Sequence, residues 1–168
     1  MKKYNLYLLI LVLTITAIAF SIRSHVTINV SDSLPKGVYI LNYIKDPDTI
    51  KKGDIVLFDT PENAKKYIYG RGYLNPNVKQ LLKKVAATNK DHVMRINNKL
   101  YINRLSHSTF KEMDSLKRPL PYLSTKELQP REEELLVLGT NQNSFDSKYF
   151  GTIKRSDVKA TAKLLFNF

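Results

Sequence analysis

The stretch Leu81-Leu82-Lys83-Lys84-Val85-Ala86-Ala87 places two adjacent lysines inside a run of apolar residues. The run reads as a β-strand, in which alternate side chains point to opposite faces. Residues 81, 83, 85 and 87 then share one face, and residues 82, 84 and 86 share the other. Each face holds one lysine among apolar neighbours, so the alternation does not choose between Lys83 and Lys84.

Similar short segments occur on both sides of this stretch. Runs of β-branched and aromatic residues that end at turn residues predict strands. Two of them form a hairpin joined across Asn97-Asn98. The predicted strands cover residues 36–44, 55–58, 81–87, 92–96, 99–103, 134–138, 149–153 and, as the last candidate, 158–166.

Other segments complete a mostly β fold. Thr60 before Pro61 has the form of a helix start, with Thr60 as N-cap, and predicts one short helix over 61–69. Residues 104–130 are polar and contain three prolines, so we expect a loop-rich insertion there. Many short strands with one short helix predict an antiparallel β domain.

The N-terminal segment predicts a transmembrane helix. From Tyr4 to Ile22 there are 19 consecutive uncharged residues. A helix of this length covers about 28 Å, close to the ~30 Å hydrocarbon core of a bilayer. Lys2 and Lys3 precede it, so the positive-inside rule keeps the N-terminus in the cytoplasm and exports the rest.

This pattern predicts a two-part organisation. We expect a single-pass anchor over 1–23 in the bacterial plasma (inner) membrane and a catalytic domain over 24–168 on the periplasmic, extracytoplasmic side. The alternative is a cleaved secretory peptide, because Ala17-Ile18-Ala19 has the small-x-small form of a cleavage site. The long apolar run favours the uncleaved anchor.

The composition limits the chemistry. The chain has 168 residues and no cysteine, which excludes disulfides, a thiolate zinc site and a cysteine nucleophile. Its 27 Lys and Arg against 15 Asp and Glu give a net charge of +12. Such a charge is typical of a nucleic-acid, acidic-partner or anionic-lipid binder, or simply of a solvated surface. With a membrane anchor, lipid is the expected partner and nucleic acid is not.

Several familiar catalytic patterns do not occur in the sequence. The histidines are His25, His92 and His107, without His-Glu-x-x-His spacing, so a zinc peptidase is not expected. There is no Gly-x-Ser-x-Gly elbow and no Walker-type phosphate loop. A Ser-His-Asp triad stays open as an alternative. We expect neither a metal nor a cofactor.

A more specific pattern follows the predicted anchor. The segment Ser31-Asp32-Ser33-Leu34-Pro35-Lys36-Gly37-Val38-Tyr39 contains Ser-x-Ser-x-Pro, which resembles the nucleophile box of type I signal peptidases. The longer Ser-Leu-Pro-Lys-Gly-Val-Tyr is similar to the TraF branch, the signal peptidases of conjugative transfer.

Further stretches resemble this family in the same order along the chain. They are Lys52-Gly53-Asp54-Ile55-Val56-Leu57-Phe58, Arg71-Gly72-Tyr73-Leu74, the lysine-bearing stretch 81–87, Arg118-Pro119-Leu120-Pro121, and Asn143-Ser144-Phe145-Asp146-Ser147-Lys148-Tyr149-Phe150-Gly151. The resemblance implies a serine endopeptidase with a signal-peptidase-like β domain. Its substrates would be exported precursor proteins, with a signal peptide or as a propilin in conjugation; some relatives join the new pilin ends into a ring.

The resemblance also implies roles for single residues. Ser33 is the nucleophile and Lys83 the general base. The backbone N–H of Ser33 and the hydroxyl of Ser31 form an oxyanion hole. Ser144 orients the lysine amine, and Asp146 braces its loop; Asp32 is expected to be only a solvated neighbour.

Two lysines depart from the family pattern. Lys84 and Lys148 stand where arginine is usual. Lysine cannot reproduce the bidentate fork of arginine. We therefore expect a salt bridge between Lys148 and Asp146 to hold its loop less rigidly.

A serine–lysine pair needs an unusual lysine. Serine attacks only when a base takes its proton, and lysine is a base only when neutral, although its ordinary pKa is ~10.4. Lowering the pKa to near 7 requires about three units, or ~4 kcal/mol, which desolvation among apolar groups can supply. Asp146 is not expected to act as a base, because a carboxylate beside Lys83 would raise the pKa of this lysine.

A non-enzymatic alternative stays open. The chain would then be a membrane-anchored basic β domain that binds anionic lipid or a secretion-channel partner. This alternative predicts that Ser33 and Lys83 lie apart or face solvent separately. The peptidase hypothesis predicts their side chains within ~2.6–3.2 Å, or somewhat farther apart without substrate. A cytoplasmic self-cleaving repressor is not expected, since an anchor and not a DNA-binding domain precedes the β segments.

Overall fold

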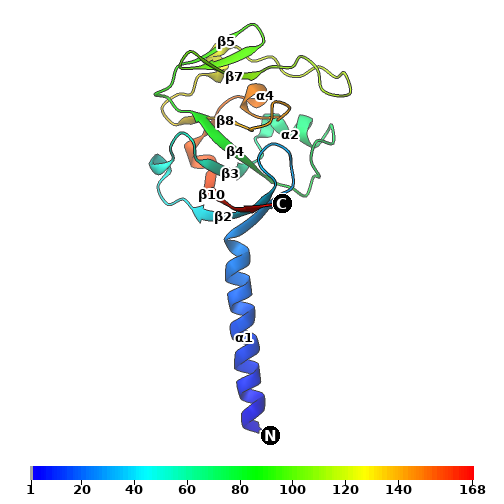
Figure 1. Cartoon of the computed structure of the whole chain (residues 1–168), viewed down its shortest axis with the longest axis vertical. Coiled ribbons are helices and arrows are strands. Elements are labelled where there is room, and N and C mark those ends of the chain that lie inside the picture. Colours follow the sequence, from blue (N-terminus) through cyan, green and yellow to red (C-terminus); the bar gives the residue numbers. More distant parts are fainter. Residues whose placement is uncertain (1) are drawn as a thin grey trace.

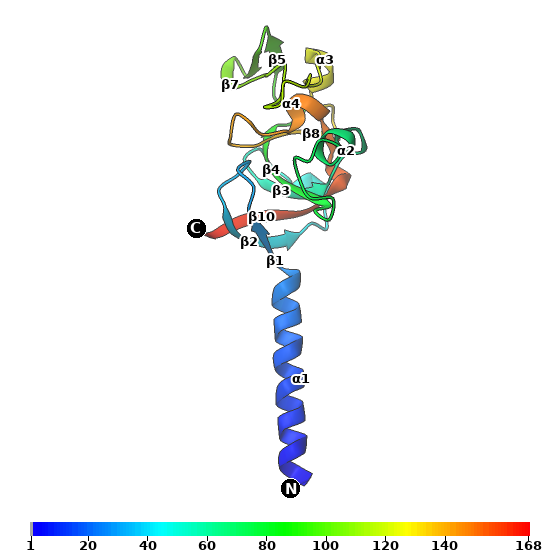
Figure 2. The same cartoon turned by 90° about the vertical axis from the view of Figure 1, so that its right-hand side faces the viewer.

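A long N-terminal helix extends away from a β-rich body (Figure 1; Figure 2). The computed structural model describes residues 2–168, except for the side chains of residues 2 and 18–23. The helices are α1 (Lys2–Ser24), α2 (Glu62–Ile68), α3 (Thr125–Leu128) and α4 (Ser147–Phe150), with 3₁₀ turns η1 (Pro47–Thr49) and η2 (Arg155–Asp157). The strands are β1 (Val26–Asn29), β2 (Gly37–Tyr43), β3 (Ile55–Asp59), β4 (Gln80–Ala87), β5 (Val93–Ile96), β6 (Lys99–Ile102), β7 (Leu105–Thr109), β8 (Glu134–Leu138), β9 (Ile153–Lys154) and β10 (Val158–Asn167).

The larger sheet places β4 between two other strands. Its order is β1-β2-β10-β3-β4-β8-β9, and the adjacent strands pair in antiparallel fashion. On one side Lys83 lies opposite Val56 of β3, and on the other Val85 lies opposite Val137 of β8. The smaller sheet, β5-β6-β7, lies at the end of the body opposite α1 (Figure 1). The predicted mostly antiparallel β fold is confirmed.

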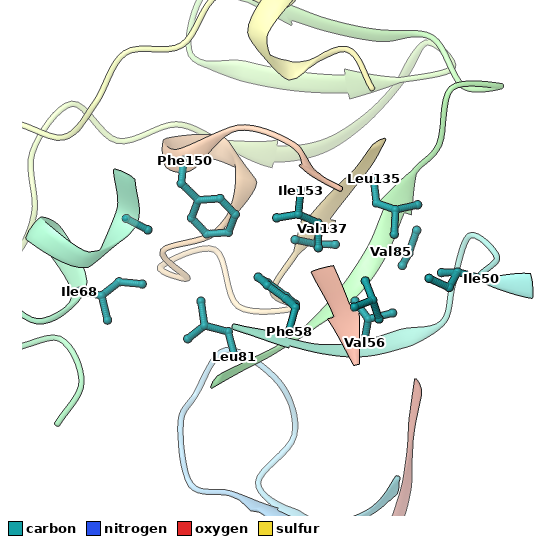
Figure 3. Packing of buried hydrophobic residues seen from close by; sticks show 12 residues of the cluster. Ile50, Val56, Phe58, Ile68, Leu81, Val85, Leu135, Val137, Phe150 and Ile153 are labelled. Carbon is teal, nitrogen blue, oxygen red and sulfur yellow. The ribbon is translucent and has the colours of Figure 1, made fainter. Parts of the chain in front are cut away.

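One face of the larger sheet builds the main core (Figure 3). Phe58 of β3 and Val85 of β4 point into it, and Ile68 of α2 and Phe150 of α4 close it from the other side. Burying apolar side chains in this way supplies the main favourable term in folding. The buried members are Ile50, Val56, Phe58, Ala64, Ile68, Leu81, Val85, Leu135, Val137, Phe150, Ile153 and Val158.

Strand β8 joins the two parts of the body because both of its faces are buried. Leu135 and Val137 belong to the main core, whereas Leu136 and Leu138 pack in a second core under the smaller sheet. Alternation along one strand thus connects both cores. The second core consists of Ala87, Val93, Leu100, Ile102, Phe110, Leu128, Leu136, Leu138 and Tyr149.

The predicted strand over 149–153 is wrong. Residues Ser147–Phe150 form the short helix α4, and only Ile153–Lys154 is a strand. The carboxylate of Asp146 accepts the backbone N–H of Lys148 and so caps this helix. All four helical residues are buried, so neither a period of two nor one of 3.6 is visible in the sequence.

Other differences are local. The predicted helix 61–69 is α2, but its N-cap is Pro61 without a side-chain hydrogen bond, and not Thr60. Thr60 Oγ1 instead donates to the Lys79 carbonyl at 3.1 Å. The segment 104–130 contains β7 and α3 in addition to loops. Strand β1, which pairs with β2, was not predicted.

The N-terminal segment is helical, as predicted, and α1 is slightly longer than the uncharged run. Among the residues described, however, we find no helix with the length and apolarity needed to cross a membrane. Ile18 and Ala19 of the alternative cleavage site lie outside the described side chains, as do residues 20–23 of the predicted anchor.

Candidate active site

Ser33 lies in the loop between β1 and β2. Its side chain is half-buried, and its Oγ lies 3.0 Å from Ser31 Oγ. The backbone carbonyl of Ser33 accepts the N–H of Thr140 at 2.7 Å. The nucleophile predicted from the sequence is therefore held by a residue that lies more than one hundred positions away in the chain. Asp32 between the two serines is exposed and pairs with Lys36, as expected for a solvated neighbour.

The structure distinguishes the two lysines of β4. Lys83 points to the same side as Leu81 and Val85 and is only 4% exposed, whereas Lys84 is exposed. Lys83 Nζ donates to Ser144 Oγ at 2.9 Å, the contact predicted for Ser144. Desolvation lowers the pKa of Lys83 to about 8, against the opposing attraction of the Asp146 carboxylate and with a small contribution from the Lys148 charge.

The loop between β8 and α4 contacts both candidate residues. Thr140 binds the Ser33 carbonyl, and Ser144 accepts the Lys83 amine. Gly139 lies where these two contacts converge: a Cβ at this position would collide with Ser144 Oγ and with the Ser33 carbonyl oxygen. Any larger residue would therefore push the nucleophile loop and the lysine partner apart.

A buried ion pair holds this loop. Lys148 Nζ donates to Asp146 Oδ2 at 3.2 Å, and both side chains are at most 1% exposed. The same carboxylate accepts the Gly139 N–H at 3.0 Å, so it ties the two ends of the loop together. The predicted bracing contact of Asp146 is therefore present with lysine in place of arginine.

Ser31, Ser33, Lys83 and Ser144 line a single open cleft of about 720 Å³. Its walls also contain strand residues of β3 and β4 and the aromatic side chains of Tyr73 and Phe145. In the part of the chain that the structure describes, Ser33 and Lys83 hydrogen-bond to Ser31 and Ser144 and not to each other. The serine–lysine dyad thus stays a prediction, with both members in one cleft.

Two of the sequence motifs meet beside this cleft. The Asp114 carboxylate accepts Tyr73 Oη at 2.6 Å and Arg118 Nε at 2.8 Å, and Arg71 donates to the Pro119 carbonyl at 2.9 Å. Burial opposes ionisation of Asp114, but these hydrogen bonds outweigh it and hold the pKa of the carboxyl well below its usual range. The segment around residue 114 therefore fixes the cleft wall at Tyr73.

The histidines take no part in this arrangement. His25, His92 and His107 are exposed, and none is among the residues that line the cleft.

Sequence reasoning missed Asn29, a buried residue at the end of β1 whose side chain binds Ser31. Its place two residues before Ser31 was the available signal, although an asparagine before a serine–proline loop ordinarily indicates a turn.

Comparison with known proteins finds a matching family and several similar proteins. The family described as "Signal peptidase, peptidase S26" matches residues 1–167. Two proteins from Escherichia coli, each described as "Plasmid transfer protein TraF", are 31% and 32% identical over 81% and 78% of this chain and 79% and 77% of their own length. A crystal structure of signal peptidase I from Enterococcus faecalis is 24% identical, with a TM-score of 0.40 over 67% of this chain and 96% of that one.

The buried pair should be essential for stability. Lys148→Met leaves the Asp146 carboxylate buried without its partner, and we expect the free energy of unfolding to fall by about 3–5 kcal/mol. Denaturant unfolding measures this loss. Lys84→Met is the matched control on an exposed lysine and should change stability by no more than about 0.5 kcal/mol. A loss below about 1 kcal/mol for Lys148→Met would contradict the bracing role.

Proposed function

This chain belongs to the signal peptidase family, peptidase S26, as the resemblance predicted, and we propose that it cleaves precursor proteins with Ser33 as nucleophile and Lys83 as general base. One observation carries the assignment of the base. A lysine with a pKa near 8 is buried in the cleft that Ser33 also lines. A perturbed titratable group beside a nucleophile in a cleft is typical of a catalytic site.

The proposed reaction is acyl transfer. Neutral Lys83 takes the proton of Ser33 Oγ as this oxygen attacks the scissile carbonyl carbon. The resulting tetrahedral oxyanion is held by the Ser33 N–H and the Ser31 hydroxyl. When the C–N bond breaks, the lysine ammonium returns the proton to the leaving amine, and an ester links the new carboxyl end to Ser33.

The second half of the reaction releases the ester. Water attacks with Lys83 again as the base and gives a free carboxylate. An amine that attacks instead forms a new peptide bond, which would close a ring if the amine were the other end of the same chain. In both cases Ser144 keeps the lysine Nζ oriented through its 2.9 Å hydrogen bond.

The relatives suggest the substrate class. Both Escherichia coli proteins are plasmid transfer proteins by their descriptions. We therefore propose an exported precursor of the conjugation machinery, most simply a pilin-type precursor. The cleft, at about 720 Å³, is large enough to hold several residues of an extended chain.

The non-enzymatic alternative receives less support. A β domain that only binds lipid or a secretion-channel partner has no reason to bury a lysine amine in an open cleft. It also predicts that Ser33 and Lys83 lie apart or face solvent separately; against the second possibility, Lys83 is buried and both residues line one cleft. Independently of this geometry, membership of a peptidase family favours the peptidase.

Cleavage of a candidate precursor tests the dyad. We expect the detergent-solubilised wild type to cut it, and Ser33→Ala and Lys83→Ala to lose activity by at least about a thousandfold while they remain folded. Circular dichroism and thermal unfolding check the fold. Product mass distinguishes hydrolysis from ring closure, because ring closure retains no added water.

The matched control for this experiment is Lys84→Ala, which removes the exposed neighbour of Lys83. It should cleave as well as the wild type. If Lys83→Ala retained wild-type activity, or Lys84→Ala lost it, the assignment of the base would be wrong.

The pH dependence follows from the state of Lys83. Only the neutral amine can accept the serine proton, so kcat/KM should rise with pH and level off above a midpoint near 8. Below the midpoint we expect about a tenfold fall per pH unit. Initial rates between pH 6 and 10 measure this, and a rate that declined as the pH rose through 8 would rule out lysine as the base.

We further propose that α1 anchors the protein in the bacterial plasma membrane with residues 24–168 on the periplasmic side. The support is the uncharged run of 19 residues and the position of α1 outside the β body (Figure 2). Described side chains such as Leu8 and Leu11 are more than half exposed. Apolar groups so placed gain free energy in lipid.

Fractionation tests the anchor. The full chain should stay in the membrane pellet after an alkaline carbonate wash, and a protease added to spheroplasts should digest the β body. Leu11→Arg should shift protein towards the supernatant, because a charge at the bilayer centre costs about 2.5–3.5 kcal/mol. Leu165→Arg, at an exposed position of β10, is the control. Complete release of the wild-type chain would refute the anchor.

A further inference from the structure

Asn29 ends β1 directly before the nucleophile loop, and its side chain is buried at 7% exposure. Its Nδ2 group donates to the backbone carbonyls of Ser31 at 3.0 Å, Leu34 at 3.0 Å and Pro35 at 3.1 Å. A carbonyl oxygen can only accept, so three of them around one end of the amide identify that end as NH₂. The orientation of the amide follows from its surroundings.

The other end of the amide binds Ser31 twice. Asn29 Oδ1 accepts the Ser31 N–H at 3.2 Å and the Ser31 Oγ–H at 2.7 Å. A hydroxyl has a single hydrogen, and here it points to Asn29. In the 3.0 Å contact between the two serines, Ser33 Oγ must therefore be the donor.

These bonds define the direction in which each hydrogen points when no substrate is bound. The Ser33 hydrogen points to Ser31, the Ser31 hydrogen points to Asn29, and the Lys83 amine points to Ser144. The Ser31 oxygen already lies beside Ser33 Oγ. Rotation of its O–H bond about Cβ–Oγ is then sufficient to redirect the Ser31 hydrogen.

We propose that Asn29 is a positioning residue that holds the Ser31 hydroxyl beside Ser33 and ready to donate to the oxyanion. This inference rests on the proposed peptidase function. When the scissile carbonyl enters, the Ser31 hydrogen turns from Asn29 Oδ1 to the developing oxyanion, while the Ser33 hydrogen turns to Lys83. A donor that needs no heavy-atom movement stabilises the transition state most effectively.

Two other residues also hold the nucleophile loop, so the role proposed for Asn29 is the orientation of the Ser31 hydroxyl. Tyr39 Oη donates to the Pro35 carbonyl at 2.7 Å, and Thr140 N–H donates to the Ser33 carbonyl at 2.7 Å. The hydrogen bonds that the described part of the chain gives the Ser31 hydroxyl are to Asn29 and Ser33, not to either of these residues. Loss of Asn29 should therefore leave the loop attached at both points but free the hydroxyl that Asn29 orients.

Steady-state cleavage of a precursor by a double-mutant cycle tests the proposal. We expect Asn29→Ala and Ser31→Ala each to lower kcat about ten- to a hundredfold, with KM changed less than about threefold. If Asn29 acts through Ser31, the double variant is no slower than the slower single variant. Asn42→Ala, an exposed asparagine of β2, is the matched control and should keep wild-type kcat.

The outcomes separate this inference from the proposed function. If cleavage depends on Ser33 and Lys83 but Asn29→Ala keeps kcat within about twofold, the peptidase stands and the role of Asn29 is refuted. Losses that multiply in the double variant refute action through Ser31. If Asn29→Ala does not fold, Asn29→Asp keeps the shape and the acceptor but loses the loop donors. Its carboxylate binds the Ser31 hydrogen more tightly, so kcat should fall in this variant also.

A second measurement needs no substrate. The Ser31 amide is protected by Asn29 Oδ1, so its hydrogen exchange should become at least about tenfold faster in Asn29→Ala and remain unchanged in Asn42→Ala. Unchanged protection of Ser31 in Asn29→Ala would overturn the inference even if the chain cleaved none of the precursors tried.

Discussion

The buried ion pair between Asp146 and Lys148 is the interaction on which the site depends. The carboxylate binds the Lys148 amine and the Gly139 N–H, so it closes the loop between β8 and α4. That loop brings Ser144 to the Lys83 amine and Thr140 to the Ser33 carbonyl. Without the pair, the two halves of the candidate dyad would lose the element that both contact.

The same pair also acts on the pKa of Lys83, although desolvation of the amine is the largest influence on it. A lone carboxylate near Lys83 would favour the ammonium form and raise its pKa. Here the negative charge of Asp146 raises the pKa of Lys83 and the positive charge of Lys148 lowers it, and burial of the amine outweighs both. The sheet supplies this burial because β4 lies between β3 and β8 and turns Lys83 to the side of the core residues. Stability and reactivity thus depend on the same few contacts.

Much of the fold could be predicted because strand patterns and turn residues are local signals. The segment Glu134–Leu138 and the start of the strand at Ile55 agree with the structure residue for residue. The prediction failed over Ser147–Phe150, where complete burial removes any periodicity and a side-chain cap from Asp146 decides for helix. Thr60 was also wrongly predicted as the cap of α2. Its hydroxyl instead donates to the Lys79 carbonyl, a partner from another segment of the chain.

The sequence by itself determined most of the strands, the order of the motifs and, through the family resemblance, the candidates Ser33, Lys83 and Ser144, but neither β1 nor the helix α4. Strand patterns and turn residues are sufficient for the elements because they involve near neighbours, whereas the candidate residues came from the resemblance of the motifs to a known family. Only the tertiary structure decided that Lys83 and not Lys84 is buried, and that Asn29 orients the Ser31 hydroxyl. The pKa of a group and the direction in which a hydroxyl hydrogen points both depend on the groups that surround it in space. Strand pairing and loop closure bring those groups together from distant parts of the chain.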